Sequence, residues 1–198
     1  MLIKKYEILC FKKFDKIYLF SKKEIKSVNT FKNKIKQTNY GIDKIKKKFR
    51  YSKKNNKIIF IGNIKYLPNL DACKYFAKNI FPKILERDSS IQFHIIGEIS
   101  KIDKFLLERN KSIVVHGKLN KLDAIIKKSF CGLANLNISS GIQTKILTYM
   151  SFGLPCISSR KVIKNFDKLN SKIIPNYKND NELIKLIFKL KNKEKFST

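Results

Sequence analysis

The sequence has few of the residues that metal and disulfide chemistry requires. Its 198 residues include no tryptophan, two histidines and four cysteines, and no two cysteines have CxxC spacing. The two histidines are far from one another in sequence, so we expect no metal site and no bound cofactor. The cysteines are expected to be free, buried thiols.

Long apolar runs are also absent. No run reaches the ~18–20 residues that a membrane-spanning helix needs. The first seven residues, MLIKKYE, have neither the apolar segment nor the cleavage site of a signal peptide. We therefore expect a cytoplasmic protein, for which peripheral contact with an anionic membrane stays open.

Acidic residues are scarce: 15 stand against 44 basic residues, which gives a net charge of +29. Such a charge favours nucleic acid or an anionic membrane as a partner. Four of the basic residues are arginine, and the abundance of lysine, asparagine and isoleucine is typical of an A+T-rich genome. A compositional origin and a partner-driven origin of the charge both stay open, and nucleic acid is the weaker partner because no nucleic-acid-binding motif is found.

Four short apolar runs predict buried parallel strands. They cover residues 58–61, 93–96, 113–116 and 130–136, and the first three end at Gly62, Gly97 and Gly117. Continuous rather than alternating apolar runs are typical of strands covered on both faces. Residues 155–158 and 172–174 predict two further strands. The fold expected is α/β, a Rossmann-like doubly wound parallel sheet that binds ligands at the carboxyl ends of its strands.

Helical spacing fills the segments between these runs. The first helix follows Pro68, with Asn69 as the expected N-cap and a kink or restart expected at Pro82. The helix that starts near Ile142 should stop at Gly153, before Pro155. Shorter helices are expected over residues 122–126 and 181–190.

Residues 1–50 follow a different plan. They predict a helix over 6–14, strands over 16–20 and 34–39, a short helix over 22–27, and a lysine-rich linker over 44–56. These elements cannot form a stable domain alone. We expect an exposed apolar surface around Phe11, Phe14, Ile17 and Leu19, and therefore self-association or a partner.

Three segments together resemble a known family. Residues 60–72 read FIGNIKYLPNLDA, residues 140–157 read SGIQTKILTYMSFGLPCI, and residues 39–43 read NYGID. They resemble the C-terminal half of group 1 (family 4) glycosyltransferases, which have the two-lobed GT-B fold. The resemblance implies that residues 51–198 are the donor-binding lobe. It implies that residues 1–50 are a short remnant of the N-terminal, acceptor lobe with its linker.

In this family a nucleotide-sugar binds at the strand ends of the C-terminal lobe and gives its sugar to an acceptor in glycan or polysaccharide synthesis. A diphosphate is stabilised by backbone N–H groups at a helix N-terminus. Ser140, Gly141 and Ile142 are expected to supply them, and Lys145 is either a phosphate-binding cation or a solvated lysine. Gly62 would lie near the phosphates, and Gly117 and Lys118 near the base. The donor-binding residues implied are Gly62, Asn63, Lys65, Gly117, Lys118, Ser139, Ser140, Gly141, Ile142, Lys145 and Thr148.

The chain departs from the family pattern at charged positions. Ser140 and Thr148 stand where full members carry the two glutamates of E-x7-E. Asn63 stands where many carry an arginine, with Lys65 as a possible substitute. Since charge-assisted hydrogen bonds are the strong ones, we expect weak donor binding and a weakly active or inactive isolated chain. No catalytic residue is assigned, and Glu98 is expected to be loop surface.

Three functions stay open. The chain is a donor lobe that works with a separately encoded acceptor lobe, or a non-catalytic remnant. Alternatively, it is a basic α/β module that binds nucleic acid or an anionic membrane surface. Salt-dependent DNA binding without a response to UDP or GDP would favour the last.

Overall fold

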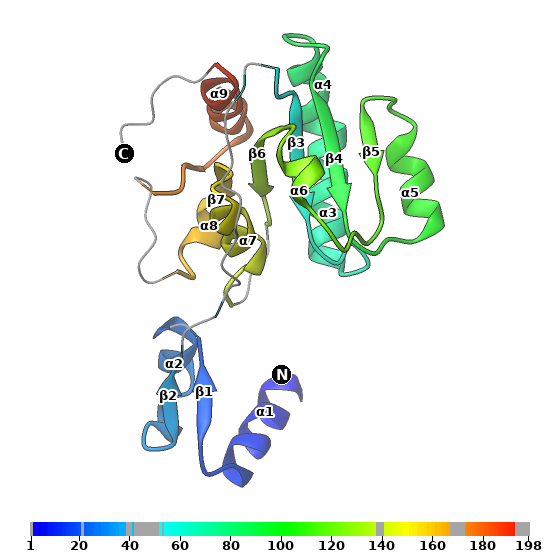
Figure 1. Cartoon of the computed structure of the whole chain (residues 1–198). Coiled ribbons are helices and arrows are strands. Elements are labelled where there is room, and N and C mark those ends of the chain that lie inside the picture. Colours follow the sequence, from blue (N-terminus) through cyan, green and yellow to red (C-terminus); the bar gives the residue numbers. More distant parts are fainter. Residues whose placement is uncertain are drawn as a thin grey trace.

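The computed structural model describes residues 2–20, 22–38, 41, 52, 54–137, 141–166 and 173–192. Its larger unit is built on a six-stranded sheet, and a smaller N-terminal unit has a sheet of two strands (Figure 1). The expected linker over 44–56 lies mostly outside the described residues.

The larger sheet has the order β5-β4-β3-β6-β7-β8, and every neighbouring pair is parallel. This is the doubly wound order of a Rossmann fold, so the predicted fold class is confirmed. The last strand begins at Asn176, two residues after the predicted run ends. The strands are β3 (Lys57–Ile61), β4 (Gln92–Ile96), β5 (Ile113–Val115), β6 (Ser129–Ala134), β7 (Cys156–Ser159) and β8 (Asn176–Tyr177).

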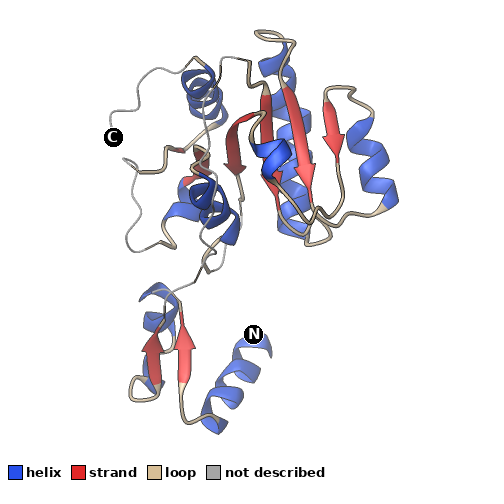
Figure 2. Ribbon diagram, in the orientation of Figure 1, coloured by secondary structure: helices blue, strands red, loops and turns tan. Residues whose placement is uncertain are grey.

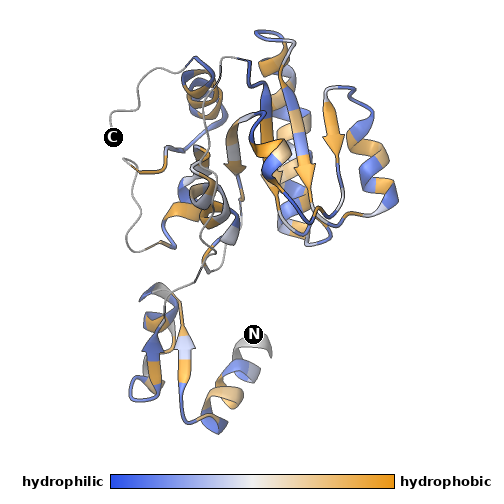
Figure 3. Ribbon diagram, in the orientation of Figure 1, coloured by the Kyte–Doolittle hydropathy of each residue, from blue (hydrophilic) through white to orange (hydrophobic). Residues whose placement is uncertain are grey.

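Helices cover the strands, and the strands carry much of the apolar sequence (Figures 2 and 3). Ile58, Ile59 and Phe60 of β3 are fully buried, as continuous apolar runs predict for a central strand. The helical elements are α3 (Leu67–Tyr75), the π-helical turn η2 (Phe76–Ile80), α4 (Phe81–Leu85), α5 (Lys101–Glu108), α6 (Asp123–Ile126), α7 (Thr144–Phe152), α8 (Arg160–Ile163) and α9 (Asp180–Lys191).

The first long helix differs from its prediction at both ends. It begins at Leu67, with Pro68 in its first turn, so Asn69 lies inside the helix and the N-cap residue is Tyr66. The expected interruption at Pro82 takes the form of the π-helical turn that precedes it. Proline lacks an N–H and clashes with the carbonyl four residues earlier, and a wider turn relieves this conflict.

The Tyr149 side chain bridges the two central strands, β3 and β6, beyond their last paired residues. The registered pairs of β3 and β6 end at Ile59 and Gly132. Beyond them, the fully buried Tyr149 hydroxyl accepts a hydrogen bond from the Ile61 N–H (3.0 Å) and donates to the Leu133 carbonyl (3.1 Å). A Cβ on Gly132 would lie 2.7 Å from the Tyr149 ring, so Gly132 makes room for this side chain.

The N-terminal unit has the elements that the sequence predicts. They are α1 (Leu2–Lys13), β1 (Ile17–Leu19), α2 (Lys22–Ser27), the 3-10 turn η1 (Asn29–Phe31) and β2 (Ile35–Gln37), with β1 and β2 parallel. The expected apolar surface is different in composition. Phe14 is 57% exposed, whereas Ile17 is buried and the Phe11 ring packs edge-on against Phe31. Among the described side chains of this unit, the other large apolar ones that are exposed are Tyr6, Leu9, Tyr18 and Phe20.

Two adjacent histidines should make the stability of the larger unit depend on pH: His94 lies in β4, and His116 directly follows β5. Nδ1 of His94 lies 2.7 Å from Nε2 of His116, and His94 is 2% exposed. Burial, then the charge of Lys57, then His116 lower the pKa of the His94 imidazole from 6.5 to about 3, and burial also lowers the pKa of His116.

Because these histidines stay neutral in the folded state, the unfolded chain binds more protons below pH 6.5. Stability should therefore fall by about 1–2 kcal/mol as the pH is lowered from 6.5 to about 5. Urea unfolding across this range measures the slope. The His94→Asn variant should have a flatter slope, and an unchanged slope would contradict the assignment.

Candidate functional site

Three glycine turns lie together where β3, β4 and β5 end. The Gly62 N–H donates to the Ile96 carbonyl at 3.0 Å, and the Gly97 N–H donates to the Gly117 carbonyl at 2.7 Å. Gly97 has a φ of +142°, and a Cβ there would lie 1.6 Å from the Gly62 carbonyl oxygen. No side chain fits between these two turns. The sequence identified Gly97 as a strand end but not as a site residue.

A cavity of about 330 Å³ opens beside these turns. Its size is within the range of small-molecule sites. Its lining combines apolar side chains with the polar residues Asn63, Glu98 and Lys118. It brings together three predicted site residues, Gly62, Asn63 and Lys118. The residues that line it are Ile61, Gly62, Asn63, Ile96, Gly97, Glu98, Lys118, Leu119 and Leu122.

Lys65 carries an ion pair at the rim of this cavity. Its Nζ lies 3.5 Å from Oε2 of Glu98, and both side chains are more than half exposed to solvent (60% and 51%). The N–H groups of Ile64 and Lys65 both donate to the Glu98 carbonyl (2.8 and 3.0 Å). An exposed pair of this kind contributes little stability, so Lys65 can exchange its partner for an anion at small cost. Glu98 is surface-exposed as expected, but it also lines the cavity.

The Gly141 turn precedes α7 on the other side of the same sheet edge. Gly141 has a φ of +67°, and a Cβ there would lie 3.1 Å from Oε1 of Glu24 in α2. The helix begins at Thr144, two residues later than Ile142, because Gln143 is still extended. The predicted site residues Ser139 and Ser140 lie outside the described residues.

Lys145 is buried, with 5% of its surface exposed, so the alternative of a solvated lysine is wrong. Its Nζ donates to Oδ1 of Asn69 at 2.6 Å and lies 4.0 Å from the centre of the Phe60 ring. Burial lowers the pKa of its ammonium group to about 8. Nδ2 of Asn69 in turn donates to the Asn63 carbonyl at 2.8 Å. Lys145 therefore stabilises the Gly62–Asn63 turn through Asn69. A direct contact of Lys145 with phosphate stays a prediction.

Thr148 is half-buried on α7, one turn beyond Thr144, and its hydroxyl donates to the Thr144 carbonyl at 3.1 Å. It brings no charge to the site. In the described residues, no cluster of three or more His, Cys, Asp or Glu side chains is arranged to hold a metal ion. No helix of the described part has the length and apolar character to cross a membrane.

Comparison with known proteins gives a family and a fold. The model of the family described as "Glycosyl transferases group 1" matches residues 55–191. No curated protein sequence matches the chain.

Among solved structures, Staphylococcus aureus TarM has a TM-score of 0.74 at 16% identity, over 96% of this chain and 39% of that one. The pneumococcal O-GlcNAc transferase GtfA, in complex with UDP and GlcNAc, has a TM-score of 0.63 at 14% identity, over 95% and 40%. Anabaena HepE, in complex with UDP, has a TM-score of 0.65 at 9% identity, over 92% and 56%. The chain thus spans between about two fifths and about half of these proteins.

Proposed function

The chain belongs to the group 1 glycosyl transferases, and we propose that its six-stranded unit is the donor-binding lobe of a GT-B enzyme. It would hold a nucleotide-sugar whose sugar passes to an acceptor in glycan synthesis. One observation carries the proposal: the turns at Gly62 and Gly97, with Lys118 directly after Gly117, line a mostly apolar cavity at the carboxyl edge of the sheet. Parallel sheets bind nucleotides at this edge.

The site divides into three parts along the sheet edge. The base enters the cavity between Gly97 and Lys118. The diphosphate lies between the Gly62–Asn63 turn and the start of α7, whose first N–H groups and dipole favour negative charge. Lys65 adds a cation by leaving Glu98, and Thr148 faces the ribose. The UDP in the GtfA and HepE complexes supports a uridine nucleotide as the first donor to test.

Glycosyl transfer also needs an acceptor held against the anomeric carbon. Such positioning contributes ~7–11 kcal/mol, and one lobe alone does not supply it. We propose that a second lobe does so, carried by a separate polypeptide or by a longer form of this chain. The exposed side chains of Leu9, Phe14 and Tyr18 in the N-terminal unit are the surface that it would cover. Self-association through the same surface is the alternative.

The central prediction for the donor site concerns Thr148. Thr148→Glu should bind UDP or GDP about 10- to 100-fold more tightly than the wild type, because a carboxylate accepts charge-assisted hydrogen bonds from the ribose hydroxyls. Isothermal titration calorimetry measures the affinity. Thr148→Gln is the matched control, since it has the same length without the charge, and it should gain less than Thr148→Glu.

Gly141→Val should weaken binding, since valine is strained at a φ of +67° and would displace the turn before α7. Equal affinities of Thr148→Glu and the wild type would exclude Thr148 from the ribose subsite. Salt-dependent binding of DNA or anionic vesicles, without any heat from either nucleotide, would favour a basic module instead.

A further inference from the structure

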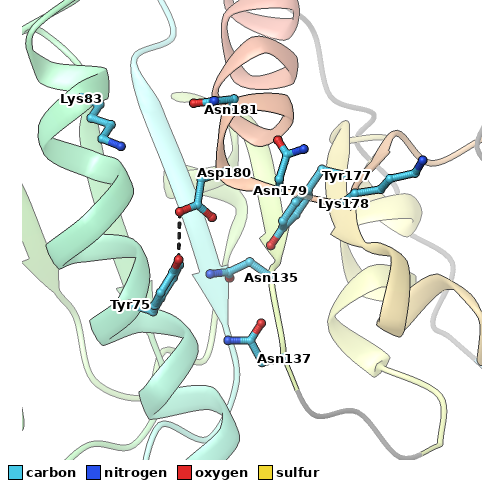
Figure 4. A pocket seen from close by; sticks show the side chains of 9 residues that line it. All are labelled: Tyr75, Lys83, Asn135, Asn137, Tyr177, Lys178, Asn179, Asp180 and Asn181. Atoms are coloured by element: carbon cyan, nitrogen blue, oxygen red, sulfur yellow. Dashed lines mark hydrogen bonds between the residues drawn. The ribbon is translucent and has the colours of Figure 1, made fainter.

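A second and larger cavity, of about 560 Å³, lies apart from the glycine turns. We call it the α3–α9 groove. One wall is formed by Tyr75 and Lys83 of the α3–η2–α4 segment, and the other by the chain that enters α9 (Figure 4). Its floor is the segment directly after β6, which carries Asn135 and Asn137. The residues that line it are Tyr75, Lys83, Asn135, Asn137, Tyr177, Lys178, Asn179, Asp180 and Asn181.

The floor of the groove holds an unpaired acceptor. Asn135 is 4% exposed, and its Nδ2 donates to the Ala72 carbonyl at 2.9 Å. Its Oδ1 has no hydrogen-bond partner within the described residues. Figure 4 shows this side chain, from the residue that directly follows β6, extending into the space bounded by Tyr75, Asp180 and Tyr177. A buried carbonyl without a donor is rare in folded proteins, so this one calls for a hydroxyl or N–H from outside the protein.

The rim adds further acceptors and two aromatic rings. The Tyr75 hydroxyl donates to Oδ2 of Asp180 at 2.8 Å, and this hydrogen bond raises the pKa of Tyr75. The Asp180 carboxylate oxygens can accept further hydrogen bonds. The exposed amides of Asn137 and Asn181 can both donate and accept. The rings of Tyr75 and Tyr177 stand on opposite sides of the space.

We propose that the α3–α9 groove binds a neutral sugar unit, separately from the nucleotide site. A sugar presents many hydroxyl donors to Asn135 and Asp180, and its C–H faces pack against tyrosine rings. A phosphate is disfavoured although Lys83 and Lys178 lie nearby, because the Asp180 carboxylate would repel it. It also has no hydrogen to donate to Oδ1 of Asn135. An apolar ligand would leave the amides unpaired.

The backbone beside the groove supports a binding role. Tyr75 immediately precedes the π-helical turn, and Lys83 follows it by three residues. Single π-helical turns within α-helices occur frequently at functional sites. If the proposed function holds, the natural ligand is part of a glycan, but the sugar binding itself requires no nucleotide.

Saturation-transfer NMR with methyl α-glucoside and N-acetylglucosamine at millimolar concentration tests the proposal. Binding should persist in saturating UDP. Asp180→Ala should weaken it about tenfold or more, and so should Asn135→Leu, which replaces the unpaired amide with an apolar group of similar size. Both variants should keep the wild-type affinity for UDP, and Lys185→Ala, an exposed change on α9 outside the groove, should keep both affinities.

Any of three results would overturn the proposal. The first is that no saturation is transferred from the wild type to either sugar, and the second is that UDP displaces the sugars. The third is that both groove variants bind the sugars as tightly as the wild type does. Should Asn135→Leu fail to fold, Asp180→Ala still decides, because Asp180 is a partly exposed residue at the start of a helix. Because the affinity for UDP is measured on the same samples, failure of sugar binding in the groove can be distinguished from failure of nucleotide binding at the donor site.

Discussion

Gly97→Ala should destabilise the larger unit by about 3 kcal/mol or more and abolish nucleotide binding. A Cβ at residue 97 would lie 1.6 Å from the Gly62 carbonyl oxygen, a distance that no side-chain movement relieves. The turns after β3 and β4 must therefore separate, and the cavity between them is lost. Urea unfolding gives the stability, and calorimetry with UDP gives the affinity.

Gly117→Ala is the matched control for this experiment. Gly117 also has a left-handed backbone, with a φ of +69°, but a Cβ there meets no atom within 4 Å. Its cost should be limited to the conformational strain of about 1–2 kcal/mol. Equal destabilisation by the two substitutions would show that backbone conformation, rather than the contact of Gly97 with Gly62, makes Gly97 necessary.

Tyr149→Phe should cost about 2–4 kcal/mol, a large effect for the loss of one oxygen atom. The hydroxyl satisfies the Ile61 N–H and the Leu133 carbonyl where β3 and β6 diverge, and phenylalanine leaves both without a partner in the core. Chemical denaturation measures the change. Tyr18→Phe, at an exposed position of the N-terminal unit, should leave stability unchanged.

A cost below about 0.5 kcal/mol for Tyr149→Phe would mean that water or a shift of the strands replaces the hydroxyl. The pairing of β3 with β6 would then remain intact after the substitution. The hydroxyl bridge also depends on the glycine at residue 132, since a Cβ there would lie 2.7 Å from the Tyr149 ring.

The sheet could be predicted from sequence because each strand is marked by a pattern of neighbouring residues. Runs such as 58–61 and 93–96 are apolar without a break and end at glycine, and the structure confirms a strand at each. The end of such runs also marks the ligand-binding edge, and Gly62 and Lys118, two site residues that the family resemblance implies, line one cavity there. The elements of the N-terminal unit were predicted for the same reason.

The environment of single side chains could not be predicted in this way, since it depends on contacts between distant residues. Lys145 looks like a solvated lysine in a lysine-rich chain, yet it is buried against Phe60 and Asn69, 85 and 76 residues earlier in the sequence. Asn69 looks like a helix cap after proline, but it links Lys145 to the Gly62–Asn63 turn. Asn135 gives no sequence signal at all, since its unpaired oxygen is visible only once α3 and β6 are packed together.

Titration of the chain with UDP, followed by the amide signals of its seven ¹⁵N-labelled glycines, tests the donor site most directly. The proposed site predicts that Gly62, Gly97, Gly117 and Gly141 shift together with one dissociation constant. The signals of Gly132 in the core and of Gly153 at the C-terminal end of α7 should not shift. Unchanged signals from all four site glycines at millimolar UDP and GDP, or shifts confined to the other glycines, would contradict a nucleotide-sugar site at this edge of the sheet.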